Sequence, residues 1–334
     1  MRSPPSGCRR GRGRRRARRL AGRIVLALPN RLVNDVALPL WRLLHGDVYA
    51  SPERLRAHVE RTSRSPEDPS PPKRFEDRLH LRLGDRQGWP VYEARPRDAT
   101  ASVTILYLHG GGYVNEITRW HWRLVRELTL EVPARCVVPI YPLAPKGTAS
   151  EVVRGAAGLA SELLAERGAD PVLVVGDSAG GGLALAASLT LRDEGLRQPS
   201  RLVLISPWLD ATLSDERQVA IAAKDKMLRR PGLREAARLY AGPLGLDDPL
   251  VSPINGDLRG LPSLTVFTGT HDILDCDSQR LARTAREVGV SVDLHEVKGA
   301  PHAFPVFPSR QGAAARREIV DVCRSSTVAQ AGRT

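Results

Sequence analysis

The chain has 334 residues, 42% of them hydrophobic, and carries a formal net charge of +13. This length allows one large α/β domain with an accessory segment and a substantial core. Residues 1–23 contain ten arginines and no acidic residue, so subtracting them leaves a charge of only +3 on the rest of the chain. The strong positive charge is therefore a property of one terminal segment and not of the folded body.

The sequence argues against a membrane-spanning protein and against a metal-binding protein. No stretch of about 18 uninterrupted apolar residues is present, so we expect no transmembrane helix. The four cysteines, Cys8, Cys136, Cys276 and Cys323, match no metal-ligand or redox spacing, and a disulfide framework is not expected at this length. These features predict a cytoplasmic protein without a metal site. The arginine-rich start followed by IVLALP imitates a signal peptide, which leaves export open.

Residues 1–23 are expected to be a disordered basic tail. Such a tail can contact nucleic acid or an anionic lipid surface. No aromatic residue is interleaved with its arginines, as single-strand binding would favour. We therefore interpret it as a solvated tail, with nucleic acid disfavoured as a partner and peripheral membrane association left open.

Residues 24–74 are expected to form two amphipathic helices and a linker. Apolar residues recur at helical spacing from Val33 through Val36 to Leu40, and a second helical pattern covers 53–61. The proline-rich stretch 65–73 then predicts a linker.

From residue 75 onward, strand and helix patterns alternate. Strands are expected over 78–83, 89–95, 102–109, 135–140, 172–176, 201–206, 263–269 and 291–297, and helices over 120–131, 150–166, 181–193, 234–240, 278–288 and 311–324. This alternation predicts a mostly parallel eight-stranded sheet with helices on both faces and antiparallel first strands. The domain is expected to cover 75–325, followed by a C-terminal tail over 326–334.

One segment, at about 207–257, interrupts the alternation between two expected strands. It has a helical and loop-like pattern. An insertion at this place lies over the C-terminal ends of the strands, where the sites of α/β proteins are found. Together with the N-terminal helices, it is expected to form a helical cap over such a site.

A glycine-rich loop, His109-Gly110-Gly111-Gly112-Tyr113, directly follows the apolar strand expected over 102–109. Consecutive glycines let the backbone turn with its N–H groups pointing into a cavity, which builds an oxyanion hole without side chains. A flexible loop without function is the alternative. The position directly after a strand favours the oxyanion-hole interpretation.

The segment 171–183 reads PVLVVGDSAGGGL, a short buried strand, a tight turn and the start of a helix. This is the context of a Gly-x-Ser-x-Gly nucleophile elbow. The turn brings Gly176 and Gly180 so close together that a Cβ at either position would clash. Ser178 is expected at the tip in strained geometry. Ala179 follows at the N-terminus of the helix, where a free N–H faces an incoming anion.

A base and an acid that orients it are expected on later loops. His302 follows the last expected strand, whereas His45, His58, His80, His121 and His295 lie on helix or strand patterns and are interpreted as packing or surface residues. His109 is expected to brace the glycine loop. Asp272 follows the strand over 263–269 and lies between serine and histidine in chain order, so it is preferred over Asp275 and Asp277, which are expected at a helix start.

Taken together, these motifs resemble the hormone-sensitive-lipase-like branch of the α/β-hydrolases. The resemblance covers roughly residues 75–325 and includes HGGGY at 109–113, GDSAGG at 176–181, YPLAP at 141–145 and SPWLD at 206–210. Two departures are Lys146, where an acidic residue is common, and Gly182, where asparagine is common.

The resemblance implies a carboxylesterase for short-to-medium acyl esters, including acetyl-hydrolases, without a cofactor. It implies Ser178 as nucleophile, His302 as general base and Asp272 as the residue that orients the base. It also implies an oxyanion hole made by the N–H groups of Gly111, Gly112 and Ala179, and a cap formed by the N-terminal region and the insertion.

Two other functions remain open at the level of sequence. One is a non-catalytic ligand-binding receptor on the same fold, because fold does not determine function. The other is an amidase that uses the same three side chains. The sequence does not determine the natural ester or the oligomeric state, and a homodimer is left open.

Overall fold

The structure of the protein is a computed structural model that describes residues 29–37, 47–167 and 171–331. The basic tail expected over 1–23 lies outside these ranges, as does Leu40 of the first expected helix. Nearer the described start, α2 (Asn30–Leu32) and a π-helical turn, η1 (Val33–Ala37), cover part of that expected helix.

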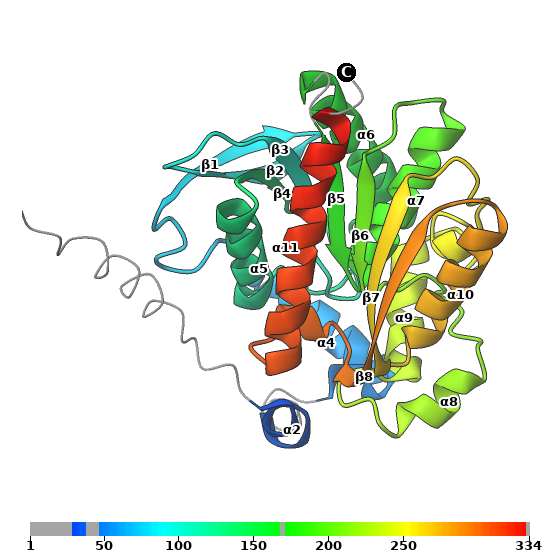
Figure 1. Cartoon of the computed structure of the whole chain (residues 1–334). Helices are drawn as coiled ribbons and strands as arrows, with labels where there is room; N and C mark the ends of the chain where they lie inside the picture. Colours follow the sequence, from blue (N-terminus) through cyan, green and yellow to red (C-terminus); the bar gives the residue numbers. More distant parts are fainter. Residues whose placement is uncertain (1–28, 38–46, 168–170, 332–334) are drawn as a thin grey trace, which may run out of the picture.

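A single eight-stranded sheet forms the centre of the molecule (Figure 1). Its spatial order is β1-β2-β4-β3-β5-β6-β7-β8. Strands β1 and β2 pair antiparallel, as do β2 and β4, and all other neighbours pair parallel. The predicted mostly parallel sheet is therefore confirmed. The strands are β1 (Leu79–Arg86), β2 (Trp89–Pro96), β3 (Val103–Leu108), β4 (Ala134–Pro139), β5 (Val172–Asp177), β6 (Arg201–Ile205), β7 (Ser263–His271) and β8 (Val292–Pro301).

Helices cover both faces of the sheet and create two separate hydrophobic cores (Figure 1). On one side, Ile105 and Tyr107 of β3 pack in the same core as α5 and α11. On the other side, Leu106 and Leu108 pack with α6, α7 and α10. Because both faces are covered, every residue of β3, β4 and β5 is buried, which explains their nearly continuous apolar sequences. These helices are α5 (Arg119–Glu131), α6 (Ala149–Arg167), α7 (Ala179–Asp193), α10 (Asp275–Glu287) and α11 (Arg310–Ala331).

Two segments that are distant in sequence form one layer at an end of the sheet, here called the helical layer (Figure 1). It consists of residues 47–64, with η2 (Val48–Ala50) and α4 (Pro52–Arg64), and residues 217–241, with α8 (Arg217–Ala222) and α9 (Arg230–Ala241). The Arg56 guanidinium donates to the Glu235 carboxylate at 2.7 Å and links α4 to α9. The Tyr49 hydroxyl lies against Gly112, just past the end of β3, so the layer meets the C-terminal edge of the sheet.

Several element boundaries differ from the sequence expectation. Helix α9 begins at Arg230, because Pro231 fits the first turn of a helix and does not prevent it. Helix α8 was not expected, since six residues are too few for a periodic signal. Helix α11 continues to Ala331, into the segment expected as a C-terminal tail. The remaining short elements are η3 (Pro253–Asn255) and η4 (Phe304–Val306).

Candidate active site

The tight strand–serine–helix turn expected around Ser178 is present. Strand β5 ends at Asp177, and α7 begins at Ala179. Ser178 has φ 53° and ψ −119°, a conformation that costs energy for any residue with a Cβ. A Cβ on Gly176 would lie 2.3 Å from the Gly180 carbonyl oxygen, and one on Gly180 would lie 2.0 Å from the Leu108 carbonyl oxygen. Both glycines are therefore sterically required.

Ser178, His302 and Asp272 form one continuous chain of hydrogen bonds. His302 lies one residue past the end of β8, and Asp272 lies one residue past the end of β7. His302 Nδ1 donates to Asp272 Oδ2 at 2.8 Å, which leaves Nε2 to accept from Ser178 Oγ at 2.9 Å. The three residues are 8%, 4% and 0% exposed for Ser178, His302 and Asp272, respectively. A serine hydroxyl in this arrangement is ready to lose its proton to the imidazole.

The charges around His302 favour its protonated form. Burial alone would lower the pKa of this imidazole, but the carboxylates of Asp272, Asp225 and Asp177 outweigh burial and raise the pKa above its ordinary value. The ring can therefore accept a proton and hold it while negative charge develops nearby.

Asp275 and Asp277, the two other acids considered from sequence, have different partners. Asp275 Oδ1 accepts from the Thr268 hydroxyl at 2.8 Å. Asp277 Oδ2 accepts from the backbone N–H groups of Leu209 and Asp210 at 3.1 and 3.0 Å. Both lie in the first turn of α10, as expected. Neither contacts His302, so Asp272 is the acid that the fold brings to the histidine.

The glycine loop turns against the serine elbow. A Cβ on Gly110 would lie 3.0 Å from the Ser178 Cβ. Gly111 and Gly112 have φ values of 126° and 64°, which glycine adopts without strain. Among the backbone hydrogen bonds within the described ranges, the N–H groups of Gly111 and Gly112 have no protein acceptor. Ala179 is the first residue of α7, where the N–H has no partner inside the helix.

A buried carboxylate, Asp177, fixes the start of this loop. Its Oδ1 accepts from the Tyr107 hydroxyl at 2.7 Å and from the Gly110 N–H at 3.1 Å, and its Oδ2 lies 3.2 Å from His121 Nε2. Burial raises the pKa of Asp177, but the electrostatic interaction with His121 and the hydrogen bonds from His121 and Tyr107 outweigh burial and lower it. The carboxylate is therefore held in its charged form.

The role of His121 was missed from sequence, where it was interpreted as a packing or surface residue. His121 Nδ1 accepts from the Thr118 N–H at 2.9 Å in a capping box at the start of α5, so Nε2 carries the proton toward Asp177. The Thr-x-x-His spacing before an apolar helix was the available signal. It could indicate the cap but not the partner on β5.

His109 braces the glycine loop, as expected. Its ring stacks on Tyr141 at a centroid distance of 4.4 Å, and its backbone carbonyl accepts from the Tyr141 hydroxyl. Burial, with a smaller electrostatic contribution from His121, lowers the pKa of His109 to about 4. Nδ1 of this neutral ring lies 2.7 Å from the Gly110 carbonyl oxygen, a contact that holds the ring against the glycine loop.

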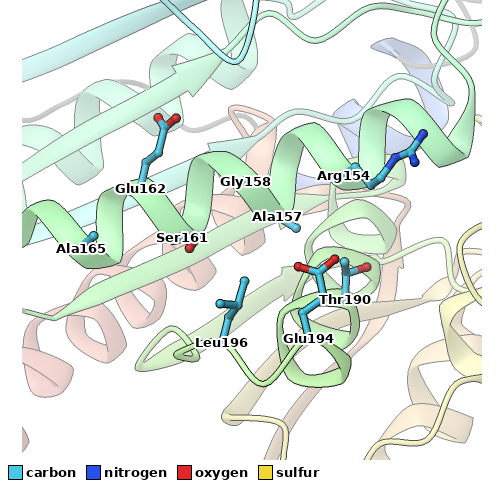
Figure 2. Close-up of a pocket in the computed structure, with 9 residues that line it drawn as sticks. All are labelled: Arg154, Ala157, Gly158, Ser161, Glu162, Ala165, Thr190, Glu194 and Leu196. Carbon is cyan, nitrogen blue, oxygen red and sulfur yellow. The ribbon is translucent and has the colours of Figure 1, made fainter.

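A hollow of about 440 Å³ lies elsewhere, on the outer surface between α6 and α7 (Figure 2). It is lined by Arg154, Ala157, Gly158, Ser161, Glu162, Ala165, Thr190, Glu194 and Leu196. None of these residues contacts Ser178, His302 or Asp272, and the lining contains no histidine or cysteine. The hollow is therefore separate from the candidate active site.

Two further findings concern the described ranges only. They contain no cluster of three or more histidine, cysteine, aspartate or glutamate residues arranged to hold a metal ion. Nor does any helix in them combine the length and the apolar character needed to cross a lipid bilayer.

Comparison with known proteins identifies relatives that share one fold family and are named as ester hydrolases. The profile of the α/β hydrolase fold family matches residues 105–306. A triacylglycerol lipase of Mycobacterium tuberculosis is 36% identical over 66% of this chain, but the match spans only 44% of that lipase. An acetyl-hydrolase of Streptomyces hygroscopicus is 34% identical over 61% of this chain and 70% of its own length.

Solved structures agree with these relatives. The crystal structure of an esterase from the bacterial hormone-sensitive lipase family superimposes with a TM-score of 0.76 at 28% identity, covering 90% of this chain and 100% of that one. A hormone-sensitive lipase from a metagenome library gives a TM-score of 0.72 at 29% identity, covering 84% and 99%. The chain therefore belongs to the α/β hydrolase fold family, among its hormone-sensitive-lipase-like carboxylic ester hydrolases.

Proposed function

We propose that this protein hydrolyses short-to-medium acyl esters, acetyl esters among them, through an acyl-enzyme formed on Ser178. The observation that carries the proposal is the hydrogen-bond chain from Ser178 Oγ through His302 to Asp272, at 2.9 and 2.8 Å, on a strained turn beside the glycine loop. The name of the Streptomyces relative, an acetyl-hydrolase, supports the choice of short acyl groups.

In the proposed first half-reaction, Ser178 Oγ attacks the carbonyl carbon of the ester while His302 Nε2 takes the hydroxyl proton. Negative charge moves to the carbonyl oxygen, where the N–H groups of Gly111, Gly112 and Ala179 donate hydrogen bonds. The C–O bond to the alcohol then breaks, and His302 returns the proton to the departing oxygen. The acyl group remains bonded to Ser178.

In the second half-reaction, a water molecule gives a proton to His302 and attacks the acyl carbon. The tetrahedral species collapses, Ser178 regains its proton and the carboxylic acid leaves. Asp272 fixes the imidazole tautomer throughout and stabilises its cation.

The helical layer is proposed to act as the cap that shapes the pocket. The contact between Tyr49 and Gly112 supports this role, since Gly112 is a proposed oxyanion donor. Acyl length would then be limited by side chains from both 47–64 and 217–241. A receptor without activity is not favoured, because all three residues of the proposed triad are present and in contact.

The test measures hydrolysis of nitrophenyl esters of increasing acyl length by the wild type and by Ser178→Ala. We expect wild-type activity to be highest on the short esters and the variant to lose almost all turnover. Ser161→Ala, in the hollow between α6 and α7, is the matched control and should keep wild-type rates. Substantial turnover in a folded Ser178→Ala protein would rule out Ser178 as the nucleophile.

A further inference from the structure

A second buried carboxylate, Asp225, lies beside the proposed triad and has no part in the mechanism above. It is in the connection between α8 and α9, and it is 1% exposed. Its Oδ1 accepts from the N–H groups of Met227 and Leu228 at 2.8 and 2.9 Å. Its Oδ2 accepts from the N–H of Ile273 at 3.0 Å. Asp225 thus joins the helical layer to the residue that directly follows Asp272.

The turn after β7 is held by two carboxylates at once. The Ile273 N–H donates to Asp225, and the next N–H, that of Leu274, donates to Asp272 Oδ1 at 2.9 Å. The other oxygen of Asp272 accepts from His302 Nδ1. Any displacement of the Ile273 backbone would therefore move the carboxylate that orients His302.

We propose that Asp225 is a positioning residue of the esterase reaction, which locks the turn that carries Asp272 and adds negative charge beside the imidazolium of His302. This inference rests on the proposed triad. It assigns to the helical layer a contribution to catalysis itself, in addition to shaping the pocket.

A carboxylate at this position is not needed merely to fill space. Burial and, to a smaller extent, the neighbouring Asp272 raise the pKa of Asp225 to about 6, although the backbone N–H groups and His302 offset part of the rise. The carboxylate is therefore charged at neutral pH. An asparagine could accept from Met227 and Leu228 with its oxygen, but its NH₂ group would then face the Ile273 N–H. Only a carboxylate supplies acceptors to both sides and the charge together.

The charged groups around Asp225 and His302 determine in which direction the loss of Asp225 changes the pKa of His302. His302 is influenced by the carboxylates of Asp272, Asp225 and Asp177. His271, which directly precedes Asp272, is the other histidine in this region. Burial, together with Lys224 and Lys226, lowers its pKa, and Asp35 from η1 acts in the opposite direction. Neutralising Asp225 removes one of the three negative charges that favour protonated His302, so His302 should lose its proton at lower pH.

The experiment compares Asp225→Asn with Asp275→Asn. Asp275 is also buried, in the same region, but it bonds to Thr268 and Gln279 and is not among the groups that raise the pKa of His302. For Asp225→Asn we expect the acidic limb of the kcat/KM profile to move to lower pH by roughly half to one unit. We also expect a loss of kcat on the order of 10-fold or more, with KM little changed. Asp275→Asn should leave the limb in place.

A second measurement is independent of turnover. The titration of His302 is followed by NMR in Ser178→Ala and in the double variant Ser178→Ala/Asp225→Asn, with folding checked by thermal unfolding. A lower His302 titration midpoint in the double variant supports the proposal even if Ser178 proves not to be the nucleophile. If Asp225→Asn does not fold, Asp225→Ser takes its place, since a hydroxyl can still accept from the Leu228 N–H.

An unchanged His302 midpoint, together with an acidic limb equal to that of Asp275→Asn, would overturn the proposal. A loss of kcat that merely follows the loss of thermal stability in both aspartate variants would do the same. Failure of the proposed function appears separately, as activity retained by Ser178→Ala.

Discussion

At the residue scale, hydrogen bonds from neighbouring residues hold the groups of the candidate site in position. Ser178 adopts a strained φ of 53°, which the fold stabilises by a hydrogen bond from its N–H to the Ile205 carbonyl at 2.8 Å. Asp177, the preceding residue, has a different role: its carboxylate accepts a hydrogen bond from the Gly110 N–H and so holds the glycine loop. Two consecutive residues thus serve the proposed nucleophile and the proposed oxyanion hole.

Tyr107→Phe tests the support of the glycine loop. The substitution keeps the buried ring but leaves the Asp177 carboxylate without one of its donors. We expect a loss of unfolding free energy of about 1–3 kcal/mol, because a buried charged group loses a hydrogen bond. We also expect a several-fold lower kcat on nitrophenyl acetate. Chemical denaturation and steady-state kinetics measure the two effects.

Tyr92→Phe is the control for this change. Tyr92 packs at the edge of the same core, and no hydrogen bond of its hydroxyl is found among the described residues. If both phenylalanine variants lose the same stability and activity, the bond between Tyr107 and Asp177 has no special importance.

Asp275 gives the protein a predictable pH dependence of stability. Burial raises the pKa of this carboxyl to about 6, so the folded protein binds its proton more tightly than the unfolded chain, where an aspartate has a pKa of about 3.9. The group therefore contributes stability at low pH, and that contribution is lost as the pH rises from about 4 through 6. Unfolding measured from pH 4 to 7 should show a smaller decline in Asp275→Asn than in wild type. A decline of the same size in both proteins would assign the effect to other groups.

The sequence was sufficient to identify Ser178, Asp272 and His302 as candidates, because each follows an expected strand in a distinctive local pattern. It was insufficient for Asp225, because the contact with Ile273 joins positions 48 residues apart and Asp225 lies in an irregular connection. His121 was missed for a similar reason. Helical periodicity assigns a residue to a face but does not name the side chain opposite.

At the element scale, tight packing of β5 against α7 makes the elbow possible. Helix α7 is buried along almost its whole length and consists mainly of small and aliphatic residues. The sequence placed Ala179 at the N-terminus of this helix, where α7 begins. The helical pattern itself was evident only from residue 181, because glycines have low helix propensity and the packing that overrides it is tertiary. The strands were predicted more accurately, since a strand that is buried on both faces has an almost uninterrupted apolar sequence.

Gly180→Ala tests the requirement for a close approach between α7 and β3. The added Cβ would lie 2.0 Å from the Leu108 carbonyl oxygen and 2.6 Å from that of His109, and both are backbone atoms that cannot rotate away. We expect severe destabilisation or failure to fold, visible as loss of soluble protein or a sharply lower Tm. Gly84→Ala, on the edge strand β1, meets no atom within 4 Å and is the control. A Gly180→Ala protein as stable as Gly84→Ala would contradict the geometry of the elbow.

At the scale of the whole molecule, the proposed catalytic groups and the helical layer are in contact at two points. One is the bond from Ile273 to Asp225, and the other is the contact of Tyr49 with Gly112. Residues 47–64 come before the first strand of the sheet, and residues 217–241 lie between β6 and β7. Both segments nevertheless lie at the same edge of the sheet. The sequence led us to expect a cap from residues 24–74 and about 207–257, and this remains a prediction. It could not show which residues link the two segments, because those contacts depend on how α4 and α9 pack.

Gly232 provides the test of this connection. A Cβ on Gly232 of α9 would lie 2.3 Å from the Tyr49 Cα and 2.4 Å from its carbonyl oxygen, so Gly232→Ala must push η2 away from α9. Because Tyr49 in turn contacts Gly112, we expect lower kcat/KM on nitrophenyl esters and a changed preference for acyl length, with the sheet still folded. Gly158→Ala is the matched helical control, since its Cβ would meet only the flexible Gln87 amide, 3.0 Å away, and alanine favours a helix over glycine by about 1 kcal/mol. Kinetics on the ester series, together with circular dichroism, would separate the two variants. An acyl-length profile in Gly232→Ala identical to that of Gly158→Ala would mean that the helical layer does not form the wall of the pocket.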